Sequence, residues 1–164
     1  MDSMVKDIKL VLSDVDGVLT DGSMYYTEAG DELKRFHTYD GFGFQLLMAA
    51  GIKTGIITSE DTKMVDRRAK KLGLDYVYQG RRHGGKLAAA EEICAKEGIT
   101  LNEVAYIGDD LNCYELLNVV GLAACPGNAR PEIKAIKGIM QLQTAGGSGA
   151  LRELADFILA EKKK

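Results

Sequence analysis

The sequence predicts an α/β fold, in which a doubly wound parallel sheet carries helices on both faces. Two features of the chain point to it. From residue 54 onward, short apolar segments alternate with longer amphipathic segments, and glycines close three of the amphipathic segments, at Gly73, Gly98 and Gly121. Apolar strands that alternate with amphipathic helices form parallel sheets covered on both sides. The 164 residues suffice for one domain, which we expect to span residues 1–164.

The predicted elements follow one another with short connections. The first part of the chain supplies a buried strand, a hairpin around the turn at 28–31 and a short apolar helix, at residues 8–13, 24–36 and 43–50. Three strand and helix pairs come next, at residues 54–58 and 62–72, 76–78 and 86–97, and 104–107 and 111–119. Two weaker strands, 122–124 and 139–142, are accompanied by helices at 131–136 and 149–159.

Composition excludes several classes of protein. Lys plus Arg total 21 against 24 Asp plus Glu, and the net charge of −3 argues against a dedicated nucleic-acid binder. No apolar run is long enough to span a membrane, and the first residues lack the pattern of a secretory signal. The three cysteines are scattered, which is typical of reduced thiols. We therefore expect a cytoplasmic protein with no membrane partner.

Carboxylates gather where two of the predicted strands end. Asp14 and Asp16 follow the first strand, and Asp109 and Asp110 follow the strand at 104–107. In parallel α/β sheets, ligands bind beyond the carboxyl ends of the strands. Several carboxylates without His or Cys ligands favour a hard cation, so we expect Mg²⁺ here. The alternative is a set of turn and helix-capping aspartates.

Thr58 and Lys86 belong to the same predicted edge and suggest phosphoryl transfer. Asp14 would be a carboxylate nucleophile, and Asp16 a general acid and base for the leaving alkoxide and the attacking water. Lys86 would neutralise charge on the transferring oxygens, to which Thr58 would donate a hydrogen bond. Lys86 could instead be solvated, although a cation at the start of a helix opposes the helix dipole.

These residues resemble, in their order, the four motifs of the haloacid dehalogenase superfamily. The matching segments are Asp14-x-Asp16-Gly-Val-Leu-Thr-Asp-Gly, Thr58, Lys86 and Gly-Asp109-Asp110. The resemblance implies a Rossmann-like sheet and the catalytic roles given above. It also implies Mg²⁺ held by the side chains of Asp14 and Asp109 and by the main-chain oxygen of Asp16.

The spacing of the motifs leaves no room for the cap domain that many members of this superfamily insert. Only 41 residues separate Asp16 from Thr58, and 27 separate Thr58 from Lys86, and predicted elements already occupy both intervals. An uncapped site is covered by a macromolecular substrate or by a neighbouring subunit, so a capless protein phosphatase stays open. The aromatic hairpin flap at 24–36 could pack against another subunit or fold onto its own core.

Nearly the whole chain also resembles a narrower group, the 3-deoxy-D-manno-octulosonate 8-phosphate phosphatases and their sialic-acid relatives. The matching segments begin at Asp16, Leu33, Tyr78, Tyr106 and Gly146. The resemblance implies a small sugar-acid phosphate as substrate and a homotetramer in which a neighbour's C-terminal segment closes each site. Gly147 and Arg152 would then approach the substrate of another subunit. The glycine-rich stretch at 146–149 could equally be a plain loop before the last helix.

Some departures from the group concern the substrate. Ser59 and Glu60 follow Thr58 where the octulosonate enzymes usually have Gly-Arg, and Thr38 stands where they usually have Val. Thr38, Glu60 and Lys71 look more like the nine-carbon sialic-acid branch, and we take them as substrate-binding candidates. Ordinary solvent-exposed charges on the helix at 62–72 would place the same residue types at these positions. A sugar acid of eight carbons and one of nine carbons therefore both remain open as substrate.

Another departure concerns support of the site. Cys113 stands where the family often has a further Asp after Asp109, and Asp110 is the candidate to replace that support.

Two rival functions remain. A phospho-accepting receiver module would also have a parallel sheet, an acidic Mg²⁺ pocket, a Thr and a Lys, but its acidic pair belongs to the first strand and its lone phospho-acceptor to a middle one. Here the Asp14-x-Asp16 segment comes first and the acidic pair comes after Lys86. A non-catalytic regulatory or oligomerisation relative would typically have lost the nucleophile or the lysine, and both are present.

Overall fold

The computed structural model describes residues 5–164, whose central feature is a parallel sheet of six strands in the order β5-β4-β1-β6-β7-β8. Every neighbouring pair in it runs parallel. The strands are β1 (Leu10–Ser13), β4 (Lys53–Ile57), β5 (Tyr76–Tyr78), β6 (Val104–Ile107), β7 (Leu122–Cys125) and β8 (Met140–Gln141). The predicted α/β fold class is confirmed.

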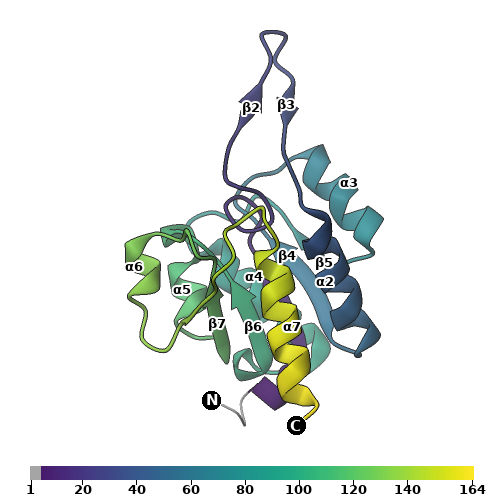
Figure 1. Cartoon of the computed structure of the whole chain (residues 1–164), viewed down its shortest axis with the longest axis vertical. Helices are drawn as coiled ribbons and strands as arrows, with labels where there is room; N and C mark the ends of the chain where they lie inside the picture. Colours follow the sequence, from purple (N-terminus) through teal and green to yellow (C-terminus); the bar gives the residue numbers. More distant parts are fainter. Residues whose placement is uncertain (1–4) are drawn as a thin grey trace.

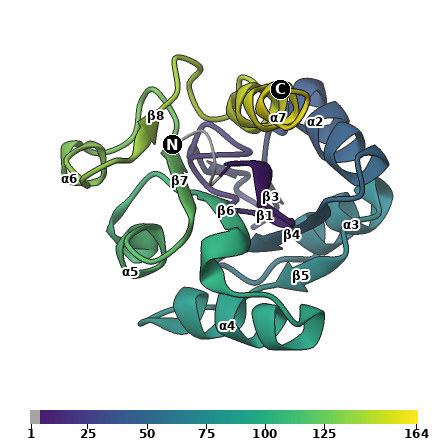
Figure 2. The same ribbon diagram turned by 90° about the horizontal axis from the view of Figure 1, so that it is seen from below.

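Helices cover both faces of this sheet (Figures 1 and 2). One face carries α2 (Thr38–Ala49), α3 (Lys63–Leu72) and α7 (Ala150–Lys162), and the other carries α4 (Gly85–Glu97) and α5 (Tyr114–Leu117). The short helix α6 (Pro131–Lys134) lies near β8 (Figure 2). Alternate residues of β1 point to opposite faces, so Val11 belongs to the first core, whereas Leu10 and Leu12 belong to the second.

The register of the central strands brings their carboxyl ends to one edge. Ser13, the last residue of β1, is paired with Ile56 of β4 and with Ile107 of β6. The residues that follow these strands therefore emerge side by side, as the strand-end rule requires. This edge is where the predicted catalytic residues meet.

A two-stranded hairpin rises from the same edge and projects away from the sheet (Figure 1). Its strands, β2 (Tyr25–Tyr26) and β3 (Glu32–Leu33), pair antiparallel. Tyr26 is 66% exposed and Leu33 58% exposed, so the alternative that the hairpin folds onto its own core is wrong. Within the described part of the chain no cap domain covers the edge, and the hairpin alone stands above it.

The helix predicted at 43–50 begins five residues earlier than expected. His37 caps α2, its ring Nδ1 accepting a hydrogen bond from the backbone of Tyr39. Gly41 obscured this start because glycine weakens helices. A Cβ atom on Gly43 would lie 3.1 Å from the Cα of Arg152, so this glycine allows α2 and α7 to pack closely.

The helix predicted at 111–119 is also different. It is split into a 3-10 turn, η2 (Leu111–Cys113), and the single α-helical turn of α5. Asp110 caps η2 by accepting a hydrogen bond from Leu111 N–H at 2.7 Å. The remaining predicted elements are present with ends shifted by a few residues, and a further 3-10 turn, η1 (Leu101–Glu103), precedes β6.

Two expectations from composition also concern the described residues. None of their helices is both long and apolar enough to cross a lipid bilayer. The three cysteines, Cys94, Cys113 and Cys125, are free and buried.

Candidate active site

A pocket of about 250 Å³ opens at the carboxyl edge of the sheet. Its lining residues come from the segments after β1 and β4, from the start of the hairpin and from η2: Asp14, Asp16, Gly22, Met24, Thr58, Ser59, Glu60 and Asn112. Three of the four predicted catalytic residues therefore share one pocket wall. Ser59, Met24 and Asn112 were not predicted, because neither periodicity nor charge distinguishes them.

Asp14 and Lys86 form a buried ion pair beneath this pocket. Lys86 Nζ lies 2.5 Å from Asp14 Oδ2, and both side chains are only 3% exposed. Asp14 Oδ1 accepts a hydrogen bond from Val15 N–H, which fixes the rest of the carboxylate. Burial acts to lower the pKa of Lys86, but the charge of Asp14 and the thiol of Cys113 outweigh it, and the pKa is raised above its ordinary value. The alternative of a solvated Lys86 is wrong.

Cys113 lies in the same buried cluster. Its sulfur is 3.0 Å from Asp14 Oδ2 and 3.3 Å from Lys86 Nζ, and it accepts a hydrogen bond from the hydroxyl of Tyr106. Burial and the neighbouring Asp14 raise the pKa of Cys113 to about 12, which keeps the thiol protonated. The expectation that Asp110 supports the site is not met, because Asp110 is exposed and caps η2.

Asp109 presents a second carboxylate to Asp14. Burial, followed by the charges of Asp14 and Asp110, raises the pKa of Asp109 to about 7. Its Oδ1 atom is buried and has no hydrogen-bond partner among residues 5–164. A cation between the two carboxylates would remove their repulsion and satisfy that oxygen.

The loop after β1 closes tightly over Asp109. A Cβ atom on Gly17, whose φ is +86°, would lie 1.9 Å from Asp109 Oδ2, so no larger residue fits without displacing the carboxylate. Ligand atoms of Asp14, Asp109 and Cys113 lie within 4.8 Å of one another. The prediction of a divalent-cation site is confirmed by this acidic group, to which the protonated Cys113 adds a neutral neighbour rather than a third charge.

Thr58 follows β4 and is held by main-chain hydrogen bonds. Its N–H donates to Tyr78 O, and its carbonyl oxygen accepts from Arg81 N–H, both at 2.9 Å. Its hydroxyl oxygen accepts a 3.4 Å hydrogen bond from Glu60 N–H. The side chain is buried and lines the same pocket as Asp14.

Asp16 is held by a residue that the sequence did not single out. Lys34, from the segment after β3, places its Nζ 2.6 Å from Asp16 Oδ1. No pattern pointed to Lys34, because the strand-end rule does not say how a hairpin lies over the sheet. The hairpin thus supplies a charged group to the pocket.

Of the predicted substrate-binding residues, Glu60 alone lines this pocket. Its carboxylate forms an ion pair with Arg82 at 3.2 Å. Lys71, expected to act with Glu60, instead lines a separate basic groove of about 260 Å³ beside the base of the hairpin, together with Lys34, Phe36, Met64, Arg67 and Arg68. Thr38 is exposed at the first turn of α2.

Gly147 and Arg152 also lie outside the pocket. Gly147 N–H donates to Val18 O at 2.9 Å, so this glycine packs on the loop after β1 of its own chain. Arg152 forms an ion pair with Asp156 at 2.9 Å, and its guanidinium lies over the ring of Phe42. The stretch 146–149 is a loop that leads into α7.

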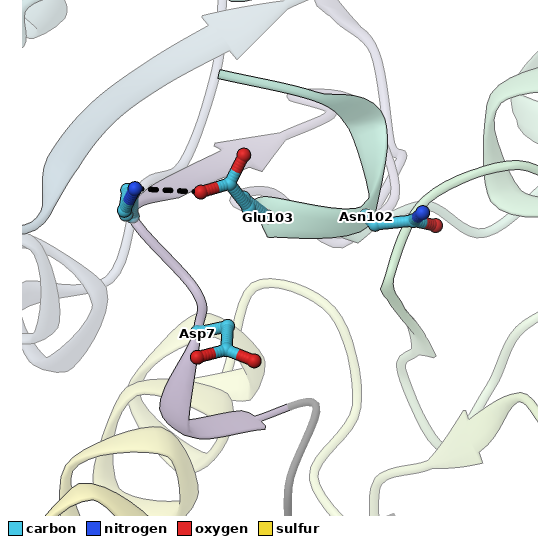
Figure 3. Close-up of a pocket in the computed structure, with 4 residues that line it drawn as sticks. Asp7, Asn102 and Glu103 are labelled. Carbon is cyan, nitrogen blue, oxygen red and sulfur yellow. Dashed lines mark ion pairs between the residues drawn. The ribbon is translucent and has the colours of Figure 1, made fainter.

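A larger hollow of about 410 Å³ lies at the opposite edge of the sheet (Figure 3). Asp7, Asn102 and Glu103 line it, and the dashed line marks the 2.6 Å ion pair between Lys9 and Glu103. These residues precede β1 and β6, so the hollow is at the amino ends of the strands. None of the predicted catalytic residues reaches it.

Comparison with known proteins agrees with this geometry. The family model of the haloacid dehalogenase-like hydrolases matches residues 80–144. The 3-deoxy-D-manno-octulosonate 8-phosphate phosphatase KdsC of Escherichia coli (strain B / BL21-DE3) is 37% identical over 159 residues, which are 97% of this chain and 83% of that protein. KdsC of Yersinia pestis is 38% identical over 158 residues, 96% of this chain and 83% of that one.

Solved structures of the same kind superpose closely. The Moraxella catarrhalis 3-deoxy-D-manno-octulosonate 8-phosphate phosphatase, in complex with magnesium, phosphate and KDO, has a TM-score of 0.93 and 38% identity over 99% of this chain and 91% of that one. The cobalt-bound Haemophilus influenzae enzyme has a TM-score of 0.91 and 34% identity over 98% of this chain and 92% of that one. The chain therefore belongs to the haloacid dehalogenase-like hydrolases, as an enzyme of the phosphatase branch that includes the 3-deoxy-D-manno-octulosonate 8-phosphate phosphatases.

Proposed function

We propose that this chain is a Mg²⁺-dependent phosphatase that hydrolyses 3-deoxy-D-manno-octulosonate 8-phosphate through a phospho-aspartyl intermediate on Asp14. The observation that carries the proposal is the buried pair of Asp14 and Lys86 at the floor of the pocket. A carboxylate held by a lysine and open to a pocket on one side is suited to attack phosphorus. The substrate is taken from the relatives that bear this name.

The metal would be held by the side chains of Asp14 and Asp109 and the main-chain oxygen of Asp16. The unpartnered Asp109 Oδ1 and the closeness of the two carboxylates support this set. When bound, Mg²⁺ would supply positive charge against the phosphoryl oxygens and offset the repulsion between the two carboxylates. The magnesium and cobalt in two related structures agree with this assignment.

The first step would transfer the phosphoryl group to the enzyme. A carboxylate oxygen of Asp14 attacks phosphorus, the bond between phosphorus and the sugar oxygen breaks, and Asp16 donates a proton to that oxygen. Lys86 holds Asp14 by an ion pair and balances the charge of the transferring group, and Thr58 donates a hydrogen bond to one of the oxygens of that group.

The second step would release phosphate. Asp16, now ionised, removes a proton from a water molecule whose oxygen attacks phosphorus. The bond between phosphorus and the Asp14 oxygen breaks, and inorganic phosphate leaves. One carboxyl group therefore acts first as an acid and then as a base, which restores the enzyme.

The sugar acid would extend from the pocket toward the hairpin. Glu60 is within the pocket and is the nearest of the proposed sugar contacts, and Lys71 belongs to the adjoining basic groove. Thr38, Gly147 and Arg152 do not line this pocket in one chain, so we assign them to the site of a neighbouring subunit. The exposed apolar side chains of the hairpin, including Tyr26 and Leu33, favour such an assembly, which we propose is a homotetramer.

We propose further that residues 1–164 act as one phosphatase domain in the cytoplasm, without nucleic acid or membrane as partner. Three free, buried thiols suit a reducing compartment.

The proposal is tested by steady-state phosphate release with Mg²⁺. Octulosonate 8-phosphate, a nonulosonate 9-phosphate and unrelated sugar phosphates are compared by kcat/KM. We expect a clear preference for the octulosonate ester and loss of activity with EDTA that Mg²⁺ restores. A preference for the nine-carbon ester would instead favour the sialic-acid branch, which Glu60 and Lys71 resemble in the sequence. Failure to hydrolyse any ester, with or without EDTA, would leave a non-catalytic role.

A further inference from the structure

Lys34 is a buried cation on an otherwise exposed hairpin. Its side chain has no exposed surface, whereas those of its neighbours Leu33 and Arg35 are more than half exposed. Its ammonium group lies 2.6 Å from Asp16 Oδ1 and 3.9 Å from Glu32 Oε1, a buried oxygen without a hydrogen-bond partner. Lys34 therefore lies between the carboxylate of Asp16, which lines the pocket, and that of Glu32 on β3.

The Asp16 carboxylate depends on this contact. Among residues 5–164, Lys34 is the one group that forms a hydrogen bond with it. Asp14, by contrast, is held at both of its oxygens, by Val15 N–H and by Lys86. Asp16 is also the more open of the two, with 25% of its side chain exposed. Its direction is therefore set from the hairpin and not from the sheet.

We propose that Lys34 is a positioning residue that aims the Asp16 carboxyl group at the leaving oxygen of the substrate. The inference rests on the proposed function, in which Asp16 carries the proton. It adds that the hairpin contributes to the chemistry of its own subunit, besides any contact it makes with another.

The role of Lys34 has a consequence that depends on the leaving group. In the transfer to Asp14, the bond between phosphorus and the ester oxygen breaks as Asp16 protonates that oxygen. A sugar alkoxide is a poor leaving group and needs the proton, whereas a nitrophenolate leaves readily without it. Misplacing Asp16 should therefore slow hydrolysis of a sugar phosphate far more than hydrolysis of p-nitrophenyl phosphate.

The experiment compares kcat/KM for these two esters, because this constant reports phosphoryl transfer up to departure of the leaving group. The variants are Lys34→Met, Lys34→Arg, Asp16→Asn and the double variant Asp16→Asn/Lys34→Met. Arg35→Met is the matched control, because Arg35 is the next cation along the chain but is exposed, and its ion-pair partner is Asp21, whose Oδ2 lies 3.6 Å from its guanidinium. Octulosonate 8-phosphate is the sugar ester, or whichever sugar phosphate the wild type hydrolyses best.

We expect Lys34→Met to lower the ratio of kcat/KM for the sugar phosphate to kcat/KM for p-nitrophenyl phosphate at least about tenfold. This is a part of the rate enhancement that a general acid provides. Lys34→Arg should recover part of the ratio, and Arg35→Met should leave it unchanged. Adding Lys34→Met to Asp16→Asn should change kcat/KM for the sugar phosphate by less than about twofold, since Lys34 acts by positioning the proton donor that Asp16→Asn has already removed.

Equal losses with both esters would overturn the proposal, because they would mean a general structural role for Lys34. A rise in KM alone would overturn it too, by making Lys34 a substrate contact in the adjoining basic groove. If Lys34→Met does not fold, Lys34→Arg and the double variant are compared in its place. The proposed function fails separately, if the wild type hydrolyses neither ester.

Discussion

The carboxylate of Asp40 accepts a hydrogen bond at 3.2 Å from the backbone N–H of Arg152, so a residue of α2 caps the amino end of α7. The residue at the N-cap of α7 is Gly149, which has no side chain to offer. Asp40 fills that place from another helix, where its negative charge also favours the positive end of the helix dipole. The contact ties the two helices together directly beneath the loop at 146–149.

This buried carboxylate should make stability depend on pH. Burial raises the pKa of Asp40 from 3.8 to about 6, so between these values the folded state holds a proton that the unfolded state has lost. Its contribution is therefore most favourable at low pH and declines as pH rises through about 6. We expect a decline of about 2 kcal/mol in the free energy of unfolding between pH 4.5 and pH 7.5.

Asp40→Asn should remove this dependence. Urea unfolding of the wild type and the variant at both pH values isolates the contribution of Asp40 as the difference between them. Asp66→Asn is the control, because Asp66 occupies the first turn of α3 and is exposed. An equal difference at the two pH values would contradict the raised pKa.

Asp14→Asn should abolish turnover by removing the nucleophile. We expect phosphate release to fall by about a thousandfold or more. The wild type, quenched in acid during turnover of ³²P-labelled ester, should carry label that hydroxylamine removes, and the variant should carry none. Circular dichroism checks that the variant is folded. Activity within about tenfold of wild type would contradict the covalent mechanism.

Gly17→Ala should weaken metal binding. The new methyl group would fall on the Asp109 carboxylate, 1.9 Å from Oδ2, and displace it. Gly30→Ala is a matched control, since Gly30 has a φ of +90° but nothing within 4 Å of a Cβ atom. Both variants should lose about 1–2 kcal/mol of stability to backbone strain. Only Gly17→Ala should also need at least about tenfold more Mg²⁺ than the wild type to reach its half-maximal rate. An equal rise in the Mg²⁺ requirement of Gly17→Ala and Gly30→Ala would contradict the close contact between Gly17 and Asp109.

The cysteines should resist thiol reagents in the folded protein. Burial raises the pKa values of Cys94, Cys113 and Cys125, that of Cys113 to about 12. A thiolate is the reactive form, so native protein should react slowly with a disulfide reagent at pH 8 and keep its activity. All three thiols should react once the protein is unfolded. Rapid labelling of one thiol with loss of activity would contradict the buried position of Cys113.

Much of the catalytic edge could be predicted because it follows from chain order. Asp14 and Thr58 come directly after strands and Asp109 two residues after one, and parallel strands end at one edge. Lys86 stood out because a lysine is unfavourable at the start of a helix. These local signals were enough to find the residues that the structure brings together.

The remainder depends on contacts that local signals do not carry. The early start of α2 was missed, because the use of its glycines in packing against α3 and α7 is visible only when these helices are placed. Glu60 and Lys71 lie in different hollows, although the sequence suggested that they act together. Lys34 was missed because the direction of a hairpin relative to the sheet is set by tertiary packing.

The packing of the loop at 146–149 against the loop after β1 has a consequence for synthesis of the chain. A Cβ atom on Gly146 would lie 1.9 Å from Gly17 O, so the segment that follows β8 rests on the loop that follows β1. The strand that precedes Asp14, β1, is made before both of its neighbours in the sheet, β4 and β6. A nascent chain that ends before residue 146 therefore lacks the segment against which the loop after β1 packs, and we expect that loop to reach its final packing only once the segment before α7 has been made.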